Sequence, residues 1–449
     1  MRLPFNKSVP LVVVCNISEA FIEFLNHAQT DEERARLIRG EQIRGDRSLL
    51  WLGDPKLVFV TFPIPHATRF CECFGYPGTR YAAPLAPSPH LSLDILREPA
   101  LMEQIVEYAG PDRTIQLIPY ATTPQFWQLV QTLREARNLT VLLPESPAPE
   151  NMWVRDYIDT KAGFHILAAR WLSNSDQLLP EGIVCQNLAG AAAVADWFGR
   201  SGRACIVKAD DGENGIGNAI IRPGDFASIA EIEHSLAANP FIRNGWITVE
   251  QFITSTHLTS PSLEVFVPPL DGGDPYITYL CNQVFLAYGD FCGVMLSREL
   301  LQTKWYPPLA ESGLTIARRL QAMGYIGHFD IDAIVDDDDN VYLLEVNSRR
   351  TGGTHAHEFA EHYFGANYLE KVSILSHDAL NSGGLVSYEQ LLEHLRDLLY
   401  PIKSELRGAI ITGASALTIN EFGCVIIGPT MADVLAQRQQ LEDRLRAPR

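Results

Sequence analysis

The sequence predicts a multidomain protein of mixed α/β and α+β class, on the strength of three observations. The chain has 449 residues, more than one ordinary hydrophobic core organises. In the first 145 residues, short apolar β-branched runs alternate with helical stretches, which is typical of a parallel sheet. After Ser382-Gly383-Gly384 the pattern resets, which predicts a small separate C-terminal unit.

The N-terminal domain is expected over residues 1–149. Its helical stretch spans Pro124–Arg137, and a Pro-rich patch, Phe62–Pro89, is interpreted as a long surface loop. The cluster Pro144–Pro149 is the expected linker to the next domain. The expected strands of this domain are Leu11–Cys15, Leu57–Thr61, Ile115–Pro119 and Leu139–Leu143.

Two further domains are expected, a larger one over residues 150–381 and a small α/β one over 382–449. The elements expected in the C-terminal domain are a helix over Tyr388–Tyr400, apolar runs at Ala409–Thr412, Ala416–Ile419 and Cys424–Ile427, and a helix from about Met431 to Leu445.

Composition excludes several classes of function. The net charge of −18 argues against a nucleic-acid partner, which needs clustered cations. The eight cysteines are scattered without C-x-x-C spacing, which favours a reduced, cytoplasmic environment. The early apolar run Leu11–Cys15 is too short for a signal-peptide core, and no run approaches the length of a membrane span. We therefore expect neither a nucleic-acid nor a membrane partner.

The strongest local pattern is a predicted β-hairpin that carries four oxygen-bearing side chains. Two apolar strands flank the polar turn Asp336–Asp339. If the turn is centred on Asp338 and Asp339, Asp332 faces Glu345 and Asp330 faces Asn347, all four on one side of the hairpin. Anionic oxygens this close repel one another unless a cation lies between them, and oxygen ligands favour Mg²⁺ or Mn²⁺. The alternative is a solvent-facing polar strand face with coincidental spacing.

A second pattern is a glycine-rich loop between two predicted strands. Ala204–Lys208 leads into Gly212, Gly215 and Gly217, and Asn218–Ile221 follows. Such a hairpin can close over phosphates with its backbone N–H groups, and Lys208 would supply a cation. Because glycine-rich turns are common in hairpins, an ordinary turn is the alternative.

Two weaker signals complete the set. Asp159 or Thr160 can cap an apolar helix over Gly163–Trp171 that Lys161 precedes, although a lysine there is usually just solvated. The strand Trp246–Ile253 runs out into a polar segment, and its exposed backbone could pair with an adenine edge. Taken alone, this strand end indicates nothing more.

Taken together and in this order, these motifs resemble the ATP-grasp family of carboxylate–amine ligases, over about residues 150–360. Within it, peptide ligases of the pheganomycin type share the three-domain plan and the Pro-rich N-terminal region. The resemblance implies an ATP-grasp fold with a Rossmann-like N-terminal domain, and ATP and Mg²⁺ (or Mn²⁺) as cofactors. It also implies that residues 150–381 divide into a nucleotide lid over about 160–255 and a metal-binding and catalytic part over about 256–381. The roles it implies are as follows: Lys161 and Lys208 neutralise phosphates; Gly212, Gly215 and Gly217 form the lid; Glu250, Gln251 and Ile253 line the adenine hinge; His257 touches the ribose; Asp332, Glu345 and Asn347 hold the metal; and Arg349 stabilises the transferring phosphoryl group.

One departure from the family concerns the substrate. Asp330 stands where D-alanine–D-alanine ligases carry an arginine for the substrate carboxylate, so recognition of that kind is in doubt. A carboxylate there attracts an ammonium or guanidinium group, so Asp330 is a candidate for selecting a cationic substrate group. The alternative is that it orients Asn347 or a metal-bound water. His355, His357 and His362 are interpreted as substrate-lining or surface residues, because their spacing suits no metal site.

The resemblance implies an ATP-dependent carboxylate–amine (peptide) ligase that forms an amide through an acyl-phosphate and releases ADP and phosphate. The expected partners are a small carboxylate donor and an amino-acid or peptide amine, in natural-product biosynthesis, and a homodimer is possible. Two alternatives stay open. One is a biotin-carboxylase-like activator of bicarbonate, and the other is a regulatory protein that binds ATP without ligation.

Overall fold

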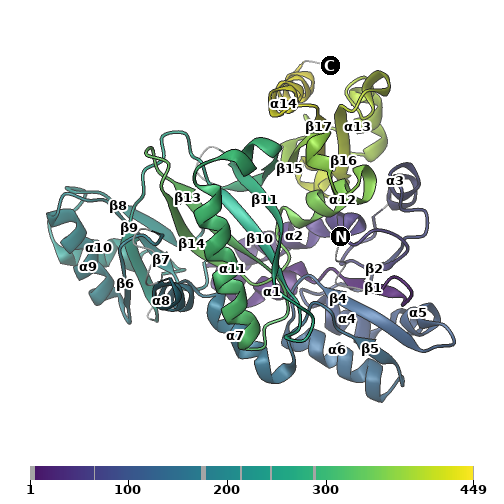
Figure 1. The fold of residues 1–449 in the computed structure, drawn as a ribbon, viewed down its shortest axis with the longest axis horizontal. Helices are drawn as coiled ribbons and strands as arrows, with labels where there is room; N and C mark the ends of the chain where they lie inside the picture. The colour runs from purple at the N-terminus through teal and green to yellow at the C-terminus, as the bar shows by residue number, and fades with distance from the viewer. Residues whose placement is uncertain are drawn as a thin grey trace.

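The computed structural model describes residues 6–64, 66–172, 178–212, 215–242, 245–286 and 290–447. Across these residues the strands form three sheets, each belonging to a distinct part of the molecule (Figure 1). A parallel sheet lies in the N-terminal domain, a small antiparallel sheet projects to one side, and a large sheet joins the centre to the C-terminal part.

The N-terminal domain is a five-stranded parallel sheet in the order β3-β2-β1-β4-β5. Its central strands are buried on both faces, since α4, α5 and α6 pack on one side and α1 with its neighbours on the other. This confirms the parallel sheet expected from the alternating pattern. The elements are β1 (Leu11–Val14), α1 (Ile17–Leu25), α2 (Asp31–Gln42), β2 (Leu57–Phe59), α3 (Ala67–Cys73), β3 (Arg80–Ala82), α4 (Leu91–Arg97), α5 (Pro99–Ala109), β4 (Thr114–Pro119), α6 (Pro124–Glu135) and β5 (Thr140–Leu142).

The Pro-rich patch over 62–89 is more ordered than the surface loop that the sequence predicts. It contains α3 and the edge strand β3, which pairs with β2 through Tyr81 and Val58. Proline is tolerated beside an edge strand because only one side of that strand needs its N–H groups for pairing. The expectation of a loop throughout this patch was therefore wrong.

The projecting part, here called the lid subdomain, is an antiparallel sheet in the order β6-β9-β7-β8. Helices α9 and α10 pack on one face through alanines and aliphatic side chains, and the other face is turned toward the large sheet. The preceding helices α7 and α8 connect it to the linker. The bounds are α7 (Met152–Ile158), α8 (Lys161–Trp171), β6 (Gly182–Cys185), α9 (Leu188–Arg200), β7 (Cys205–Ala209), β8 (Asn218–Ile221), α10 (Ile229–Ala237) and β9 (Ile247–Gln251).

The large sheet has the order β14-β13-β10-β11-β12-β15-β17-β16. Helix α11 covers one face, where it packs mainly on β10 and contributes Leu309, Ile316 and Leu320 to the core beneath it. The bounds are β10 (Pro261–Val267), β11 (Tyr276–Phe285), β12 (Phe291–Leu296), α11 (Tyr306–Ala322), β13 (Gly327–Val335), β14 (Val341–Asn347), α12 (Thr354–Phe364), β15 (Ser373–Asn381), α13 (Tyr388–Leu395), β16 (Gly408–Gly413), β17 (Glu421–Gly428) and α14 (Met431–Arg446).

The C-terminal part continues the large sheet across residue 382, because β15 pairs with β17. Helices α13 and α14 begin at the residues expected from the sequence, although α13 ends at Leu395, before Tyr400. Of the three apolar runs there, those around β16 and β17 are strands, whereas Ala414–Ile419 forms a 3₁₀ helix. No helix among the described residues is long and apolar enough to cross a membrane.

The hairpin of β13 and β14 places the acidic side chains as predicted. Asp332 pairs with Glu345, and Asp330 pairs with Asn347. Nearer the turn, however, the register changes by one, since Ala333 pairs with Leu343. Leu344 is therefore the extra residue of a β-bulge, which the symmetric hairpin prediction did not contain.

Candidate functional site

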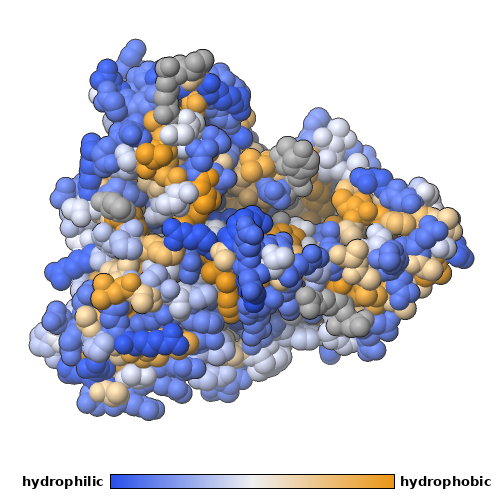
Figure 2. Space-filling model, turned by 180° about the vertical axis from the view of Figure 1, so that it is seen from behind, coloured by the Kyte–Doolittle hydropathy of each residue, from blue (hydrophilic) through white to orange (hydrophobic). Residues whose placement is uncertain are grey.

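A cavity of about 420 Å³ lies between the lid subdomain and the large sheet. Seen from behind, apolar side chains gather in the notch between the lid subdomain and the rest of the molecule (Figure 2). The cavity is lined from the lid by β7, the glycine loop and the end of β9, and from below by β10 to β14. The lining residues expected from the sequence are Lys208, Gly215, Glu250, Gln251, Ile253, Asp330, Asp332, Glu345, Asn347 and Arg349.

The floor of the cavity carries the acidic side chains of β13 and β14. The Asp332 carboxylate accepts hydrogen bonds from Gln283 Nε2 at 2.6 Å and from Asn347 Nδ2 at 3.1 Å. Asp330 Oδ2 accepts one from Ser262 Oγ at 3.0 Å. Burial raises the pKa of Asp332, and the neighbouring charges of Asp330 and Glu345 raise it further. The protein alone thus leaves a negative cluster that a cation would stabilise.

The donor set fits a hard divalent cation. Asp332, Glu345 and Asn347 offer two carboxylates and an amide from neighbouring positions of one hairpin, which is oxygen chemistry suited to Mg²⁺ or Mn²⁺. Among the described residues, no group of three or more histidine, cysteine, aspartate or glutamate side chains is arranged to hold a metal. The two-carboxylate set therefore needs the amide, and further ligands such as substrate oxygens, to complete a metal's coordination shell.

Lys208 reaches across from the lid to the floor of the cavity. Its Nζ lies 2.6 Å from Glu250 Oε2 and donates to the carbonyl of Leu344, the bulged residue, at 3.3 Å. His165 Nδ1 lies 3.2 Å from the other oxygen of Glu250. Burial raises the pKa of Glu250, but Lys208 and His165 lower it by more, so this carboxylate is held ionised.

Helix α8 brings in the second lysine. Thr160 caps the helix by accepting a hydrogen bond from Gly163 N, as the sequence allows. Lys161, the first helical residue, lies with its Nζ 3.1 Å from Glu345 Oε2 and also contacts the carbonyl of Gly212 in the glycine loop. Lys161 does not line the cavity itself, but it joins the lid loop to a predicted metal ligand.

The glycine loop connects β7 and β8 antiparallel, as predicted, with residues 213–214 outside the described part. Gly215 lines the cavity at φ +78°, and Gly217 has φ +89°, conformations that favour glycine. A Cβ on Gly217 would meet Ala209 Cβ at 3.0 Å, and one on Gly212 would meet the Ile216 carbonyl at 2.7 Å. Side chains at these three positions would therefore clash with the loop or strain its backbone.

The expected adenine hinge lies where β9 ends. Glu250, Gln251 and Ile253 line the cavity together with Phe252, and Ile206 and Leu344 provide apolar surface nearby. Glu250 is buried in the ion pair with Lys208, which leaves the backbone of the following residues as the hinge surface. His257 is exposed and is not among the residues that line the cavity. Its contact with a ribose stays a prediction.

Arg349 lines the cavity two residues after the predicted metal ligand Asn347. Its NH2 donates to Asn347 Oδ1 at 2.9 Å, and its guanidinium lies 4.8 Å above the ring of Phe21 from α1. The ring of Tyr120, which follows β4, is 5.7 Å away. The N-terminal domain therefore supplies two aromatic rings against the Arg349 guanidinium, although neither ring lines the cavity itself.

Several other lining residues were not predicted, because no sequence motif marks them. Gln283 and Ser262 contact the two aspartates, and Tyr279 and Phe291 pack against the glycines at 352 and 353. They come from β10, β11 and β12, which have no motif of their own, and only the sheet order brings them beside β13. The histidines interpreted as substrate-lining or surface residues do not border this cavity. His355 is buried in α12, whereas His357 and the exposed His362, whose ring contacts the Gly75 carbonyl, border a second, larger cavity.

A larger cavity of about 1020 Å³ lies between the N-terminal domain, β11 and α12. Its lining includes Asp54, Arg80, His328, Glu358 and Glu361, but none of the predicted nucleotide or metal residues. The smaller cavity is therefore the candidate site.

The parallel N-terminal domain, the lid subdomain and the carboxylate hairpin of the large sheet have the ATP-grasp fold, which confirms the fold expected from the sequence. N5-carboxyaminoimidazole synthetase from Staphylococcus aureus is similar along nearly the whole chain, with a TM-score of 0.52, 11% identity and coverage of 99% of both chains. Biotin carboxylase from Campylobacter jejuni is similar with a TM-score of 0.56 and 13% identity, covering 97% of this chain and 91% of its own.

No protein-family model matches the sequence. Among curated proteins, L-propargylglycine–L-glutamate ligase of Streptantibioticus cattleyicolor is 26% identical over an alignment of 269 residues, and the match covers 53% of this chain and 54% of the relative. The chain thus spans about half the length of the curated relative it matches. The name of that relative describes a ligase that joins two amino acids.

Proposed function

We propose that the protein is an ATP-dependent carboxylate–amine ligase that forms an amide through an acyl-phosphate and releases ADP and phosphate. The observation that carries the proposal is the convergence of one set of charges on one cavity. Lys208 from the lid lines the same cavity as the carboxylates of Asp332 and Glu345 and the guanidinium of Arg349, which come from the hairpin and the loop after it. A site with cations and carboxylates on facing walls suits a polyphosphate and its metal.

The nucleotide would lie with its adenine at the end of β9 and its phosphates toward the floor. Ile206 and Leu344 flank the hinge with apolar surface, and the backbone around Gln251 to Ile253 offers hydrogen bonds to an adenine edge. Lys208 and Lys161 place two ammonium groups near the carboxylates of Glu250 and Glu345. When phosphates enter, these cations can neutralise them, and the glycine loop can close over them without obstruction.

Asp332, Glu345 and Asn347 would hold the divalent metal. Mg²⁺ bound there would screen the charge that develops during phosphoryl transfer. The protein side chains define where this cation can sit, since Gln283 orients Asp332 and Lys161 orients Glu345.

The carboxylate substrate would enter at the Arg349 end of the cavity. An unactivated carboxylate resists attack by an amine because oxide is a poor leaving group, so phosphorylation by the γ-phosphate must come first. Arg349, held by Asn347 and the Phe21 ring, offers a fixed positive charge to the transferring phosphoryl group. The amine then attacks the acyl carbon, phosphate leaves, and the enclosed cavity limits hydrolysis of the acyl-phosphate.

For the substrates, we propose an amino acid as carboxylate donor and an amino acid or peptide as amine. The curated relative supports this, because its name describes the joining of L-propargylglycine to L-glutamate. Asp330 is 4% exposed, lines the cavity, and has one oxygen, Oδ1, without a hydrogen-bond partner among the described residues. That oxygen is placed to receive an ammonium or guanidinium group of a substrate.

The direct experiment is a matrix of L-amino acids and short peptides, incubated with ATP and Mg²⁺ and assayed for ADP and for product mass. L-propargylglycine, L-glutamate and arginine belong in the matrix, and bicarbonate serves as the donor that a carboxylase would use. Asp338→Asn is a matched control, because Asp338 lies exposed in the turn of the same hairpin. ADP release that depends on both an amino-acid donor and an amine, with a product of the summed mass less water, is the expected result. ADP release with bicarbonate alone would contradict it.

A further inference from the structure

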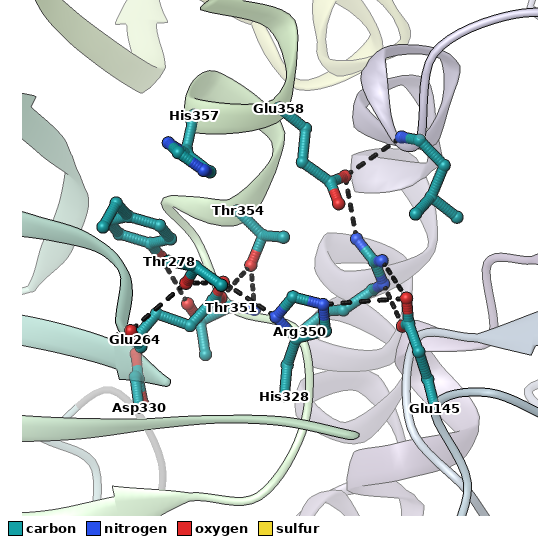
Figure 3. A network of polar contacts seen from close by, with 12 residues as sticks. Glu145, Glu264, Thr278, His328, Asp330, Arg350, Thr351, Thr354, His357 and Glu358 are labelled. Carbon is teal, nitrogen blue, oxygen red and sulfur yellow. Dashed lines mark hydrogen bonds and ion pairs between the residues drawn. The ribbon is translucent and has the colours of Figure 1, made fainter. Parts of the chain in front are cut away.

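Behind the candidate site lies a buried polar network centred on Arg350, the residue that follows Arg349 (Figure 3). Arg350 is 1% exposed. Its Nε and NH2 donate to the two oxygens of Glu145 at 2.9 and 2.7 Å, and its NH1 donates to Glu358 Oε2 at 2.9 Å. The Arg350 backbone N–H donates to the Tyr120 carbonyl at 3.2 Å. The side chain is thus fixed in a bidentate pair and a second ion pair at once.

The network continues from Glu145 to the large sheet through His328. The Nε2 of His328 lies 3.6 Å from Glu145 Oε1, and its Nδ1 lies 2.9 Å from Glu264 Oε1. Because both ring nitrogens face carboxylates, the ring suits two donors, which is the imidazolium form. Burial lowers the pKa of His328, but Glu264 and Glu145 raise it by more, to about 10.

Glu264 in turn binds the end of the loop that follows Arg350. Thr278 Oγ1 donates to its Oε1 at 2.8 Å, and Thr354 Oγ1 donates to its Oε2. Thr354 Oγ1 also accepts the backbone N–H of Thr351 at 2.9 Å. The Thr351 hydroxyl lies 3.0 Å from Tyr279 Oη. The chain between Arg350 and Thr354 is therefore tied at both ends to one network.

The network holds a stretch of backbone that lines the candidate site. Arg349, Thr351, Gly352 and Gly353 all border the cavity, whereas Arg350 points away from it into the network. Three carboxylates, a guanidinium and an imidazolium are expensive to bury, and apolar residues of similar size would often be as stable. We therefore expect the main effect of this network to be on the position of the backbone that it contacts, and not on the free energy of folding.

We propose that Arg350 is a positioning residue: together with Glu145, His328, Glu264 and Glu358 it clamps the loop over residues 349–354, and so fixes Arg349 and the Gly352–Gly353 backbone at the acyl-phosphate end of the site. The inference rests on the proposed function for the role of Arg349. Because Glu145 belongs to the linker segment and Leu52 N donates to Glu358 at 3.1 Å, the clamp also ties the loop to the N-terminal domain.

Hydrogen–deuterium exchange of the full chain with bound ADP and Mg²⁺ tests the clamp without any knowledge of the substrates. In Arg350→Gln, amides over 349–354 should exchange about tenfold faster, while amides of the lid strands are unchanged. Glu358→Gln removes only one of the two charged partners and serves as a milder second variant. Arg47→Lys is the matched control, because Arg47 forms a partly buried ion pair with Asp378 at 2.7 Å and lines neither cavity.

The dissociation constant for ADP with Mg²⁺ should stay within about twofold of the wild type in Arg350→Gln, since the hinge and the lysines are not part of the clamp. With a substrate pair from the screen, kcat should fall about tenfold or more while KM for ATP changes by less than about twofold, and Arg350→Lys should recover part of the loss. Unchanged amide exchange over 349–354 in both Arg350→Gln and Glu358→Gln would overturn the proposal. Exchange that rises equally over 349–354 and over the strands of the large sheet would also overturn it. Failure of the substrate screen bears on the proposed function, while the exchange result decides the clamp.

Discussion

Replacement of Lys208 by methionine separates the structural and functional roles of the Lys208–Glu250 pair. Both side chains are at most 5% exposed, and the two charges are 2.6 Å apart. Methionine fills a similar volume but leaves the Glu250 carboxylate with His165 as its remaining partner among the residues that the structure describes. Breaking a buried pair from one side costs about 3–5 kcal/mol, so the free energy of unfolding of the lid subdomain should fall by that amount.

The double variant Lys208→Met with Glu250→Gln is the informative companion. Removing both charges leaves no unpaired ion, so most of the lost stability should return. Affinity for ADP should stay low in both variants, because the loss of one charge-assisted contact to phosphate costs about 1.5–3 kcal/mol, or roughly 10- to 100-fold. Thermal unfolding and calorimetric titration with ADP measure the two effects. If Lys208→Met unfolds at the same temperature as the wild type, the ion pair with Glu250 does not stabilise the fold. If the double variant binds ADP with wild-type affinity, Lys208 does not contact the phosphates.

Three further predictions concern the hairpin and the network. Glu345→Gln should preserve the thermal unfolding midpoint but abolish Mg²⁺-dependent ATP turnover, because it removes a metal ligand; turnover close to that of Asp338→Asn would remove the metal assignment. Asp330→Asn should raise KM for one cationic substrate and leave KM for ATP nearly unchanged, whereas an increased Mg²⁺ requirement with unaltered substrate preference would leave Asp330 only an orienting role. The raised pKa of His328, about 10 against 6.5 in the unfolded chain, stabilises the fold fully below pH 6.5, and this contribution is lost as pH rises toward 10. The loss should be roughly 1 kcal/mol per pH unit and absent from His328→Asn, and equal pH dependence in both proteins would show that the ring is not held charged.

The parts of the site that the sequence predicts lie in short continuous segments. Asp332 and Glu345 can be paired because one turn joins their strands, and the Thr160 cap beside Lys161 is a local signal as well. The bulge at Leu344 could not be predicted, because nothing in the hairpin's composition distinguishes a regular ladder from one with an extra residue. It nevertheless matters, since the Leu344 carbonyl receives Lys208.

Residues that depend on long-range pairing were not predictable in the same way. Ser262 and Gln283 reach the aspartates only because β10 and β11 lie beside β13, an order that no local pattern specifies. The clamp joins Glu145 to Arg350 across 205 positions of sequence. At β3, proline-rich composition favoured a loop, and pairing with β2 prevailed over that preference.

Transfer of labelled oxygen tests the central claim most directly. With ¹⁸O in the carboxylate of the donor that the substrate screen identifies, the reaction is run with ATP, Mg²⁺ and the amine, and the phosphate products are analysed by mass. An acyl-phosphate mechanism predicts that one ¹⁸O atom appears in the released inorganic phosphate for each amide formed, with ADP as the nucleotide product. Label in AMP, or release of pyrophosphate, would contradict the account, because the carboxylate would then have been activated by adenylation.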